Sequence, residues 1–241
     1  GIDTITTLGG YDIVLGGHEG DTIGAGDGEN IVFGDDGIIV YDSDGDASDI
    51  DLIESTSTTY AGGSDTITSG TGQDIVIGGR YGDQIQAGAG DNVVIGDSGR
   101  LVATDGAEGL LGHPMDIDLI DTTEPTDGGA DTITTLQGDD IVFGGTDTDL
   151  IYAGAGVDIV FGDQGEVSST SGDNWVVTYD NESAPWFEGY YYTATDTQND
   201  DAGTDDYIYG EAGGDYILGQ QGSDVIFGGS GDDDIYGGHN V

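Results

Sequence analysis

The sequence predicts an all-β fold: a parallel β-solenoid of nine-residue repeats, interrupted by three β-rich inserts. Three observations carry this prediction. A nine-residue unit recurs sixteen times, in four blocks of four. Every copy has Asp or Asn at its sixth position and Ile or Val at its eighth. Glycine, the residue that tight turns favour, accounts for 48 of the 241 residues. A short unit repeated at a fixed period is typical of solenoids.

The repeat has a recognisable consensus. The unit reads G-G-x-G-x-D-x-U-x, where U is a large apolar residue, and its most regular copy is Gly-Gly-Ser-Gly-Asp-Asp-Asp-Ile-Tyr at residues 228–236. This pattern resembles the repeat-in-toxin (RTX) family of calcium-binding nonapeptide repeats, of the kind found in large bacterial surface adhesins and extracellular fibres. The resemblance covers about two thirds of the chain. It implies a right-handed parallel β-roll in which two repeats form one turn and Ca²⁺ lies in the loops between turns.

The residues themselves favour the same architecture. Side chains alternate along a strand, so a three-residue strand at positions 7–9 turns its middle side chain one way and its flanks the other. Position 8 is therefore expected to form a continuous Ile/Val ladder in the core. Positions 1–6 must reverse the chain, which favours glycine because glycine tolerates positive φ. A disordered Gly/Asp-rich linker is the alternative, and the uninterrupted ladder argues against it.

Position 6 carries the candidate metal ligands. Stacked turns bring its carboxylates close together, and a hard cation bound by carboxylates and loop carbonyls relieves their repulsion. Oxygen-only ligation suits Ca²⁺, so multiple Ca²⁺ ions are expected. The candidate ligands are Asp3, Asp12, Asp21, Asn30, Asp65, Asp74, Asp83, Asn92, Asp131, Asp140, Asp149, Asp158, Asp206, Asp215, Asp224 and Asp233.

The two edges of the predicted roll differ at position 4. In an 18-residue turn, odd-numbered repeats share one edge and even-numbered repeats share the other. The even edge keeps glycine at this position, at Gly10, Gly28, Gly72, Gly90, Gly138 and Gly156. The odd edge has Glu19, Tyr81 and Asp147 instead. On this ground, the even edge is the better candidate for well-formed calcium sites.

Blocks and inserts alternate along one continuous solenoid. The expected order is block 1 (1–33), insert 1 (34–62), block 2 (63–95), insert 2 (96–128), block 3 (129–161), aromatic-rich insert 3 (162–203) and block 4 (204–241). The inserts open with the similar tetrapeptides Gly34-Asp-Asp-Gly, Gly96-Asp-Ser-Gly and Gly162-Asp-Gln-Gly. The first two inserts contain alternating apolar segments that read as strands.

Positions 7 and 9 predict where the inserts lie. They are mostly polar in odd repeats, as at Thr66 and Thr68, and apolar in even repeats, as at Ile141 and Phe143. A contiguous apolar face of this size is not normally left to solvent. We expect the inserts to cover it as a third layer; a second subunit is the alternative. Insert 3 concentrates aromatic residues that could make a further contact: Trp175, Tyr179, Trp186, Phe187, Tyr190, Tyr191 and Tyr192.

Composition restricts the partners. The formal net charge is −47, with Arg80 and Arg100 as the only basic residues besides three histidines. Such a chain repels itself unless cations neutralise it. The same charge excludes nucleic acid and anionic membrane surfaces as partners. No apolar run approaches the roughly 18 residues of a membrane span, so membrane insertion is not expected. Cysteine is absent, which excludes disulfides.

Enzymatic activity is not expected. No serine, cysteine or histidine constellation recurs at a spacing that would build a nucleophile and its base. Paired carboxylates are too frequent here to indicate a glycosidase. The glycine-rich loops lack the helix and the lysine of a phosphate-binding loop. An ice-binding Thr-x-Thr face is disfavoured because Leu150 and Tyr152 interrupt it.

Together these features favour a calcium-stabilised extracellular structural rod or filament subunit of a bacterial surface or secreted protein, which folds on binding Ca²⁺ outside the cell. One alternative is an adhesin module that binds a glycan or surface protein through the aromatic insert. Another is the RTX region of a secreted enzyme or toxin whose catalytic domain lies outside this sequence. Because the sequence opens and closes in mid-repeat, we expect end-to-end self-association or continuation into further repeats.

Overall fold

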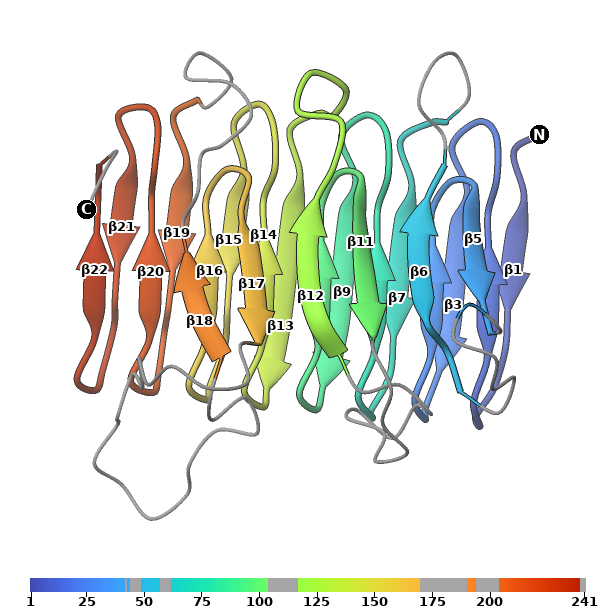
Figure 1. The fold of residues 1–241 in the computed structure, drawn as a ribbon, viewed down its shortest axis with the longest axis horizontal. Helices are drawn as coiled ribbons and strands as arrows, with labels where there is room; N and C mark the ends of the chain where they lie inside the picture. Colours follow the sequence, from blue (N-terminus) through green and yellow to red (C-terminus); the bar gives the residue numbers. More distant parts are fainter. Residues whose placement is uncertain are drawn as a thin grey trace.

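The computed structural model describes residues 1–41, 43, 49–56, 62–103, 117–169, 190–193 and 204–238. These residues form two parallel eight-stranded sheets and one six-stranded sheet. Figure 1 shows their turns stacked side by side, with strands β1 and β22 at opposite ends. The predicted fold class, an all-β parallel β-roll, is confirmed. In the part of the chain that is described, no helix is long and apolar enough to cross a membrane.

The odd-numbered repeats form the first parallel sheet, called here the odd sheet. Its strands, in spatial order, are β1 (Thr4–Thr6), β3 (Thr22–Gly26), β7 (Thr66–Ser69), β9 (Gln84–Ala89), β13 (Thr132–Gln137), β15 (Leu150–Tyr152), β19 (Tyr207–Tyr209) and β21 (Val225–Phe227). Thr4 pairs with Thr22, which fixes the turn at 18 residues. Pairing keeps the same repeat positions across an insert, where Thr22 pairs with Thr66. The inserts therefore leave the register of the solenoid unchanged.

The even-numbered repeats form the second parallel sheet, called the even sheet. Its strands are β2 (Ile13–Leu15), β4 (Ile31–Phe33), β8 (Ile75–Ile77), β10 (Val93–Ile95), β14 (Ile141–Phe143), β16 (Ile159–Phe161), β20 (Tyr216–Leu218) and β22 (Asp234–Tyr236). Between the two sheets lies a core of position-8 residues, including Val32, Ile67, Val94 and Ile151, all of them buried. The sequence predicted this ladder.

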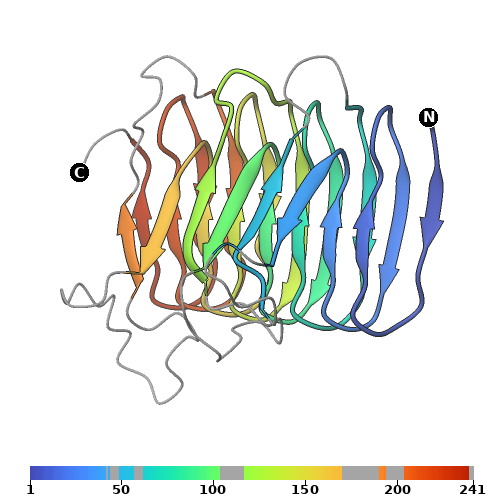
Figure 2. The same cartoon turned by 45° about the vertical axis from the view of Figure 1, so that its right-hand side comes forward.

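The inserts supply the third sheet. Its strands, in spatial order, are β18 (Tyr190–Thr193), β17 (Glu166–Ser169), β12 (Ile117–Thr122), β11 (Gly99–Ala103), β6 (Leu52–Ser55) and β5 (Gly37–Val40). Every pairing in it is antiparallel. Each insert contributes two strands, and Figure 2 shows this sheet as a separate layer in front of the stacked turns.

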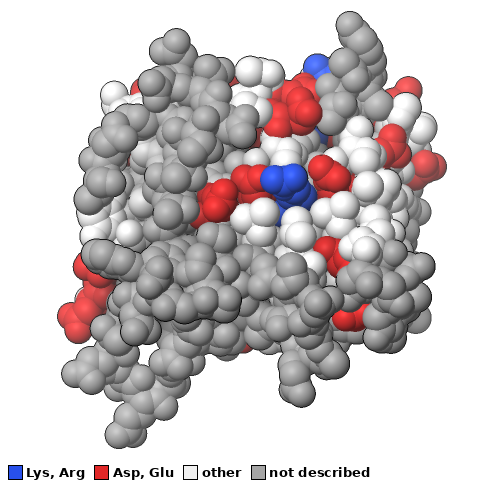
Figure 3. All heavy atoms as spheres, viewed as in Figure 1, with Lys and Arg blue, Asp and Glu red and all other residues white. Residues whose placement is uncertain are grey.

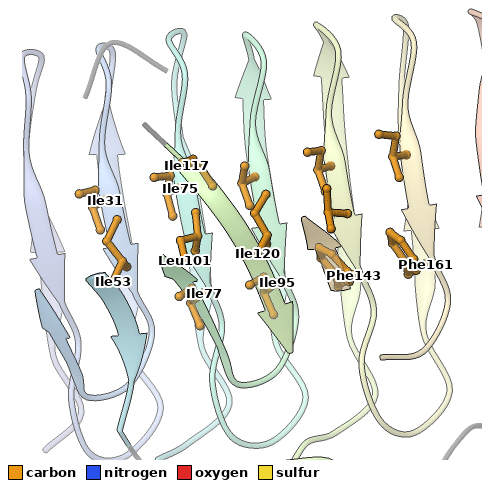
Figure 4. Packing of buried hydrophobic residues seen from close by; sticks show 14 of the residues in the cluster. Ile31, Ile53, Ile75, Ile77, Ile95, Leu101, Ile117, Ile120, Phe143 and Phe161 are labelled. Carbon is orange, nitrogen blue, oxygen red and sulfur yellow. The ribbon is translucent and has the colours of Figure 1, made fainter. Parts of the chain in front are cut away.

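A second core fills the space between the even sheet and the third sheet. Phe143 and Phe161 of the even sheet are fully buried there, with their rings stacked at a centroid distance of 4.6 Å. Figure 4 shows Ile53, Leu101 and Ile120 of the third sheet packed against the even-sheet side chains. The expectation that the inserts cover the apolar face is confirmed for most of the even sheet, whereas Ile13 and Leu15 of β2 stay exposed. The odd sheet keeps the opposite, more polar outer face, where Thr66 and Thr68 are exposed.

The aromatic residues of insert 3 fall largely outside this description. Trp175, Tyr179, Trp186 and Phe187 are not among the described residues. Tyr190, Tyr191 and Tyr192 belong to β18, of which the backbone alone is described. The predicted contact through these side chains stays a prediction.

Candidate metal sites

The residue at position 6 links each turn to the next. Because it directly precedes a strand of fixed register, it recurs at the same place in every turn. Its main-chain N–H donates a hydrogen bond to the side-chain Oδ1 of position 6 one turn later; the Asp140 N–H, for example, lies 2.9 Å from Asp158 Oδ1. We call each position-6 residue with this bond a rung.

The rungs bring all sixteen predicted site residues into two rows. The odd edge carries Asp3, Asp21, Asp65, Asp83, Asp131, Asp149, Asp206 and Asp224. The even edge carries Asp12, Asn30, Asp74, Asn92, Asp140, Asp158, Asp215 and Asp233. Each row runs along the whole described solenoid, so each edge presents a continuous line of potential metal ligands.

The second carboxylate oxygen of most rungs has no partner. Eleven Oδ2 atoms are buried and accept no hydrogen bond in the described part of the chain, those of Asp21, Asp65, Asp74, Asp83, Asp131, Asp140, Asp149, Asp158, Asp206, Asp215 and Asp224. An ionised carboxylate can only accept hydrogen bonds, so each atom is an uncompensated negative group. Burying such a group is costly unless a proton or a cation compensates it.

Electrostatics give the same result. Burial raises the pKa of Asp149 to about 10 and that of Asp158 to about 9, and neighbouring carboxylates add to both shifts. Burial likewise raises the pKa of Asp83 to about 9 and holds that of Asp131 well above its usual range. A raised pKa means that the charged form is disfavoured at the site. The rows therefore need positive charge from elsewhere if they are to be ionised near neutral pH.

The chain's own cations do not meet this need. The Arg80 side chain forms an ion pair with Asp127, and Arg100 Nη2 lies 3.0 Å from Asp121 Oδ2. Neither partner is a rung. In Figure 3 the few basic atoms on the face of the third sheet lie among acidic ones. Neutralisation of the rungs thus requires cations from solution.

The odd edge keeps a positive φ at position 4 despite its substitutions there. Glu19, Tyr81 and Asp147 have φ of 72°, 76° and 69°, in the left-handed region that glycine normally occupies. Most glycines at position 4 on the even edge also have positive φ, but with larger values, such as 118° at Gly28 and 138° at Gly72. The backbone at position 4 thus differs between the two edges as well as the side chain, and the expectation that the even edge forms the better calcium sites stays a prediction.

Position 1 also distinguishes the edges. On the odd edge it is glycine in every short loop, and a Cβ built on Gly144 would lie 2.4 Å from Asp149 Oδ2 and 2.1 Å from the Gly162 carbonyl oxygen. On the even edge of the first three blocks, position 1 is Thr, Ala or Ser. The odd edge thus places bare backbone against the unpartnered oxygen, which leaves carbonyl and carboxylate oxygens close together.

Comparison with known families supports a metal function for these loops. The family model of the RTX calcium-binding nonapeptide repeat matches residues 61–80, 68–100, 134–166, 202–226 and 209–238. The chain carries RTX repeats. A search of curated proteins finds no match to the chain.

The RTX repeats of this protein have oxygen donors that fit Ca²⁺, which binds six to eight oxygen ligands. Within the described ranges, no three Asp, Glu or His side chains converge on one point. Rung carboxylates alone would therefore not complete a calcium site, and main-chain carbonyls of the RTX loops would have to supply the other ligands. The buried Oδ2 atoms are the side-chain donors left available for this purpose.

Sequence reasoning missed three further acidic residues: Asp35, Asp97 and Asp163, here called the root aspartates. Each is the second residue of an insert and is buried. Asp97 Oδ1 accepts the Gly129 N–H at 2.9 Å, and its Oδ2 accepts the Thr146 hydroxyl at 2.7 Å. The root aspartate therefore joins both ends of insert 2 to the RTX loop of the next turn.

The other two root aspartates make equivalent contacts. Asp35 accepts the N–H groups of Gly63 and Arg80. Asp163 accepts those of Thr204 and Gln221. The shared Gly-Asp opening of the inserts was the available signal, because it repeats where the inserts are otherwise unlike. These carboxylates anchor the inserts between RTX turns.

Proposed function

We propose that this chain is a calcium-stabilised extracellular rod or filament segment of a secreted or surface-located bacterial protein, and that it folds on binding Ca²⁺ outside the cell. One observation carries the proposal: buried carboxylate oxygens without a partner form two rows along the solenoid of a chain whose net charge is −47. These rows favour the compact state when cations are present and oppose it when they are absent.

In this proposal the two oxygens of each rung aspartate have separate tasks. Oδ1 accepts the N–H of the preceding turn and fixes the spacing of the turns. Oδ2 is a calcium ligand, together with carbonyls of the adjoining loops. Bound Ca²⁺ supplies the positive charge that the rows lack. The chain would then stay unfolded in calcium-poor cytosol and form a stiff rod in calcium-rich surroundings.

The continuity of the solenoid supports a structural role. The rungs cross all three inserts without a break, as from Asp21 to Asp65, and the third sheet reinforces one side along most of the length. At the ends, β1, β2, β21 and β22 each pair with one neighbour within the described chain. Further repeats or a second copy would complete these edges, which is the basis for end-to-end association.

The described aromatics do not favour a glycan-binding role. Tyr152, Tyr209 and Phe227 form a ladder on the outer face of the odd sheet, with stacked rings at centroid distances of 4.9 and 5.1 Å. Rings stacked on one another present their edges to solvent, whereas a sugar packs on a ring face. We therefore keep the rod as the proposed function.

The test is folding as a function of calcium. In EDTA, far-ultraviolet circular dichroism should report a coil, and millimolar Ca²⁺ should restore a β signal, since extracellular modules bind Ca²⁺ with a Kd of roughly 10⁻⁴–10⁻³ M. Negative-stain microscopy should show rods or filaments only in the samples that contain calcium. A cooperative β signal that persists in EDTA at neutral pH would overturn the proposal.

A further inference from the structure

The even edge differs from the odd edge at two rungs, where asparagine replaces aspartate. Asn30 and Asn92 are fully buried. Their Oδ1 atoms accept the N–H groups of Asp12 and Asp74, as the Oδ1 of each aspartate rung does from the second turn onward. The side-chain atom that remains, Nδ2, is therefore the counterpart of the Oδ2 that has no partner at the aspartate rungs.

Both amide nitrogens are fully engaged with oxygen atoms. Asn92 Nδ2 lies 2.7 Å from the Gly90 carbonyl oxygen and 2.9 Å from Asp140 Oδ1. Asn30 Nδ2 lies 2.9 Å from the Gly28 carbonyl oxygen and 2.9 Å from Asp74 Oδ1. It also approaches the Gly26 carbonyl at 3.3 Å. All these partners are acceptors, which settles which end of each amide is the nitrogen.

Each amide nitrogen thus lies among acceptor oxygens, which is the kind of surroundings that a bound calcium ion has. It lies between a loop carbonyl and the carboxylate of the next turn, and it supplies two N–H donors to them. At Asp158 and Asp215 the equivalent Oδ2 is buried and unpartnered within the described chain. Between acceptor oxygens, a carboxylate oxygen needs a cation, whereas an amide nitrogen needs none.

We propose that the side-chain amides of Asn30 and Asn92 take the place of calcium ions, so that the even edge of the first two blocks is closed by hydrogen bonds and binds no metal at these two rungs. This inference rests on the proposed function, because it presumes that the aspartate rungs bind Ca²⁺. Calcium at the even edge is then confined to the aspartate rungs, which are Asp12, Asp74 and the uninterrupted run from Asp140 to Asp233.

The order of rungs supports a difference between the two halves of the edge. From Asp12 to Asp140 aspartate alternates with asparagine, so no two charged rungs are neighbours. From Asp140 onward every rung is aspartate. The odd edge has aspartate at every rung. The two asparagine rungs of the even edge are therefore closed without metal, while the aspartate rungs, Asp74 among them, need it.

The test counts bound calcium by equilibrium dialysis of the intact chain. Asn92→Asp should bind about one ion more than the wild type, and the double variant Asn30→Asp/Asn92→Asp about two more, because each substitution converts a donor into an oxygen ligand. Gln86→Glu is the matched control: it adds the same charge at an exposed position of β9 and should leave the count unchanged. An unchanged count in the folded double variant would overturn the inference.

A second experiment applies if the double variant fails to fold. Asp158→Asn introduces the amide at an aspartate rung; it should bind about one ion fewer and fold at a lower calcium concentration. Binding equal to that of the wild type would overturn the inference. In the wild-type protein, the side-chain amide protons of both asparagines should exchange slowly by NMR. A wild type that binds no calcium would instead refute the proposed function, so the two failures are distinguishable.

Discussion

Asp140 and Asp158 lie one turn apart on the even edge, and the Asp140 N–H donates a 2.9 Å hydrogen bond to Asp158 Oδ1. The other oxygen of Asp158 is buried and has no partner among the described residues. One oxygen of the same side chain therefore holds two turns together, while the other creates a need for positive charge. The rung aspartate therefore both sets the spacing of the turns and creates the need for a cation.

Asp158→Ala should destabilise the calcium-loaded protein. The substitution leaves the buried N–H of Asp140 without an acceptor, which costs about 1–3 kcal/mol, and it removes a proposed calcium ligand. Urea unfolding in saturating Ca²⁺ measures the loss. Asp232→Ala removes the same charge at an exposed position and is the control. Equal effects of the two substitutions would show that total charge, and not the rung, determines stability.

Acid should replace calcium in promoting the fold. Without metal, the folded-state pKa of Asp83 is about 9 and that of Asp149 about 10, whereas an unperturbed Asp has a pKa of about 3.9. The folded chain therefore binds more protons than the unfolded chain between these limits. Its stability is greatest at the acidic end of this window and falls as the pH rises through 9 to 10.

Circular dichroism in EDTA checks this pH dependence. The β signal should increase as the pH falls from neutral toward 5, and the increase should be much smaller in millimolar Ca²⁺, because bound calcium has already neutralised the rungs. Light scattering at each pH excludes aggregation as the source of the signal. A signal in EDTA that does not change with pH would contradict the burial of ionisable rungs.

Phe143→Ala should weaken the contact between the even sheet and the third sheet. Phe143 is fully buried and stacks on Phe161, so its truncation leaves a cavity and should cost about 3–5 kcal/mol. Chemical denaturation at saturating calcium is the measurement. Phe227→Ala, at a side chain that is 53% exposed on the odd sheet, should cost much less. Comparable losses would mean that the third layer contributes little.

Asp97→Asn should loosen insert 2 without removing it from the solenoid. Both carboxylate oxygens of Asp97 accept hydrogen bonds, from Gly129 and from Thr146, and an amide offers one acceptor in place of two. One buried donor is then left facing another, at a cost of about 1–3 kcal/mol. Hydrogen exchange should accelerate at Gly129 and Thr146 and in the adjoining strand β12. Asp232→Asn is the matched exposed control, and unchanged exchange at Gly129 would contradict the anchoring role.

The sequence was sufficient for features that repeat at a constant spacing. The core residues at position 8, such as Val160, and the covered apolar face, such as Phe161, recur at the same place in each repeat, so their environment follows from periodicity alone. The sixteen rungs were also found in this way. Whether each of them binds calcium stays a prediction.

The features that the sequence did not predict depend on contacts between residues that lie on either side of an insert in the sequence. Asn92 meets Asp140 across 48 residues, and Asp97 meets Thr146 across 49, because insert 2 lies between the partners. No fixed period predicts such pairs. The left-handed conformation of Tyr81 could not be predicted for another reason. The preference of the residue alone argues against it, and the stacked neighbouring turns impose it.

The rungs also give the molecule a polarity. On both edges the N–H of one turn points to the carboxylate of the turn that follows it in sequence, as from Asp3 to Asp21 and from Asp215 to Asp233. The solenoid therefore has a direction, with acceptor groups facing its N-terminal end and donor groups facing its C-terminal end. Two copies meeting by their N-terminal ends would bring carboxylate against carboxylate, and two copies meeting by their C-terminal ends would bring N–H against N–H. Any extension that continues the rows must therefore add copies in a single orientation, which would give a fibre two chemically different tips.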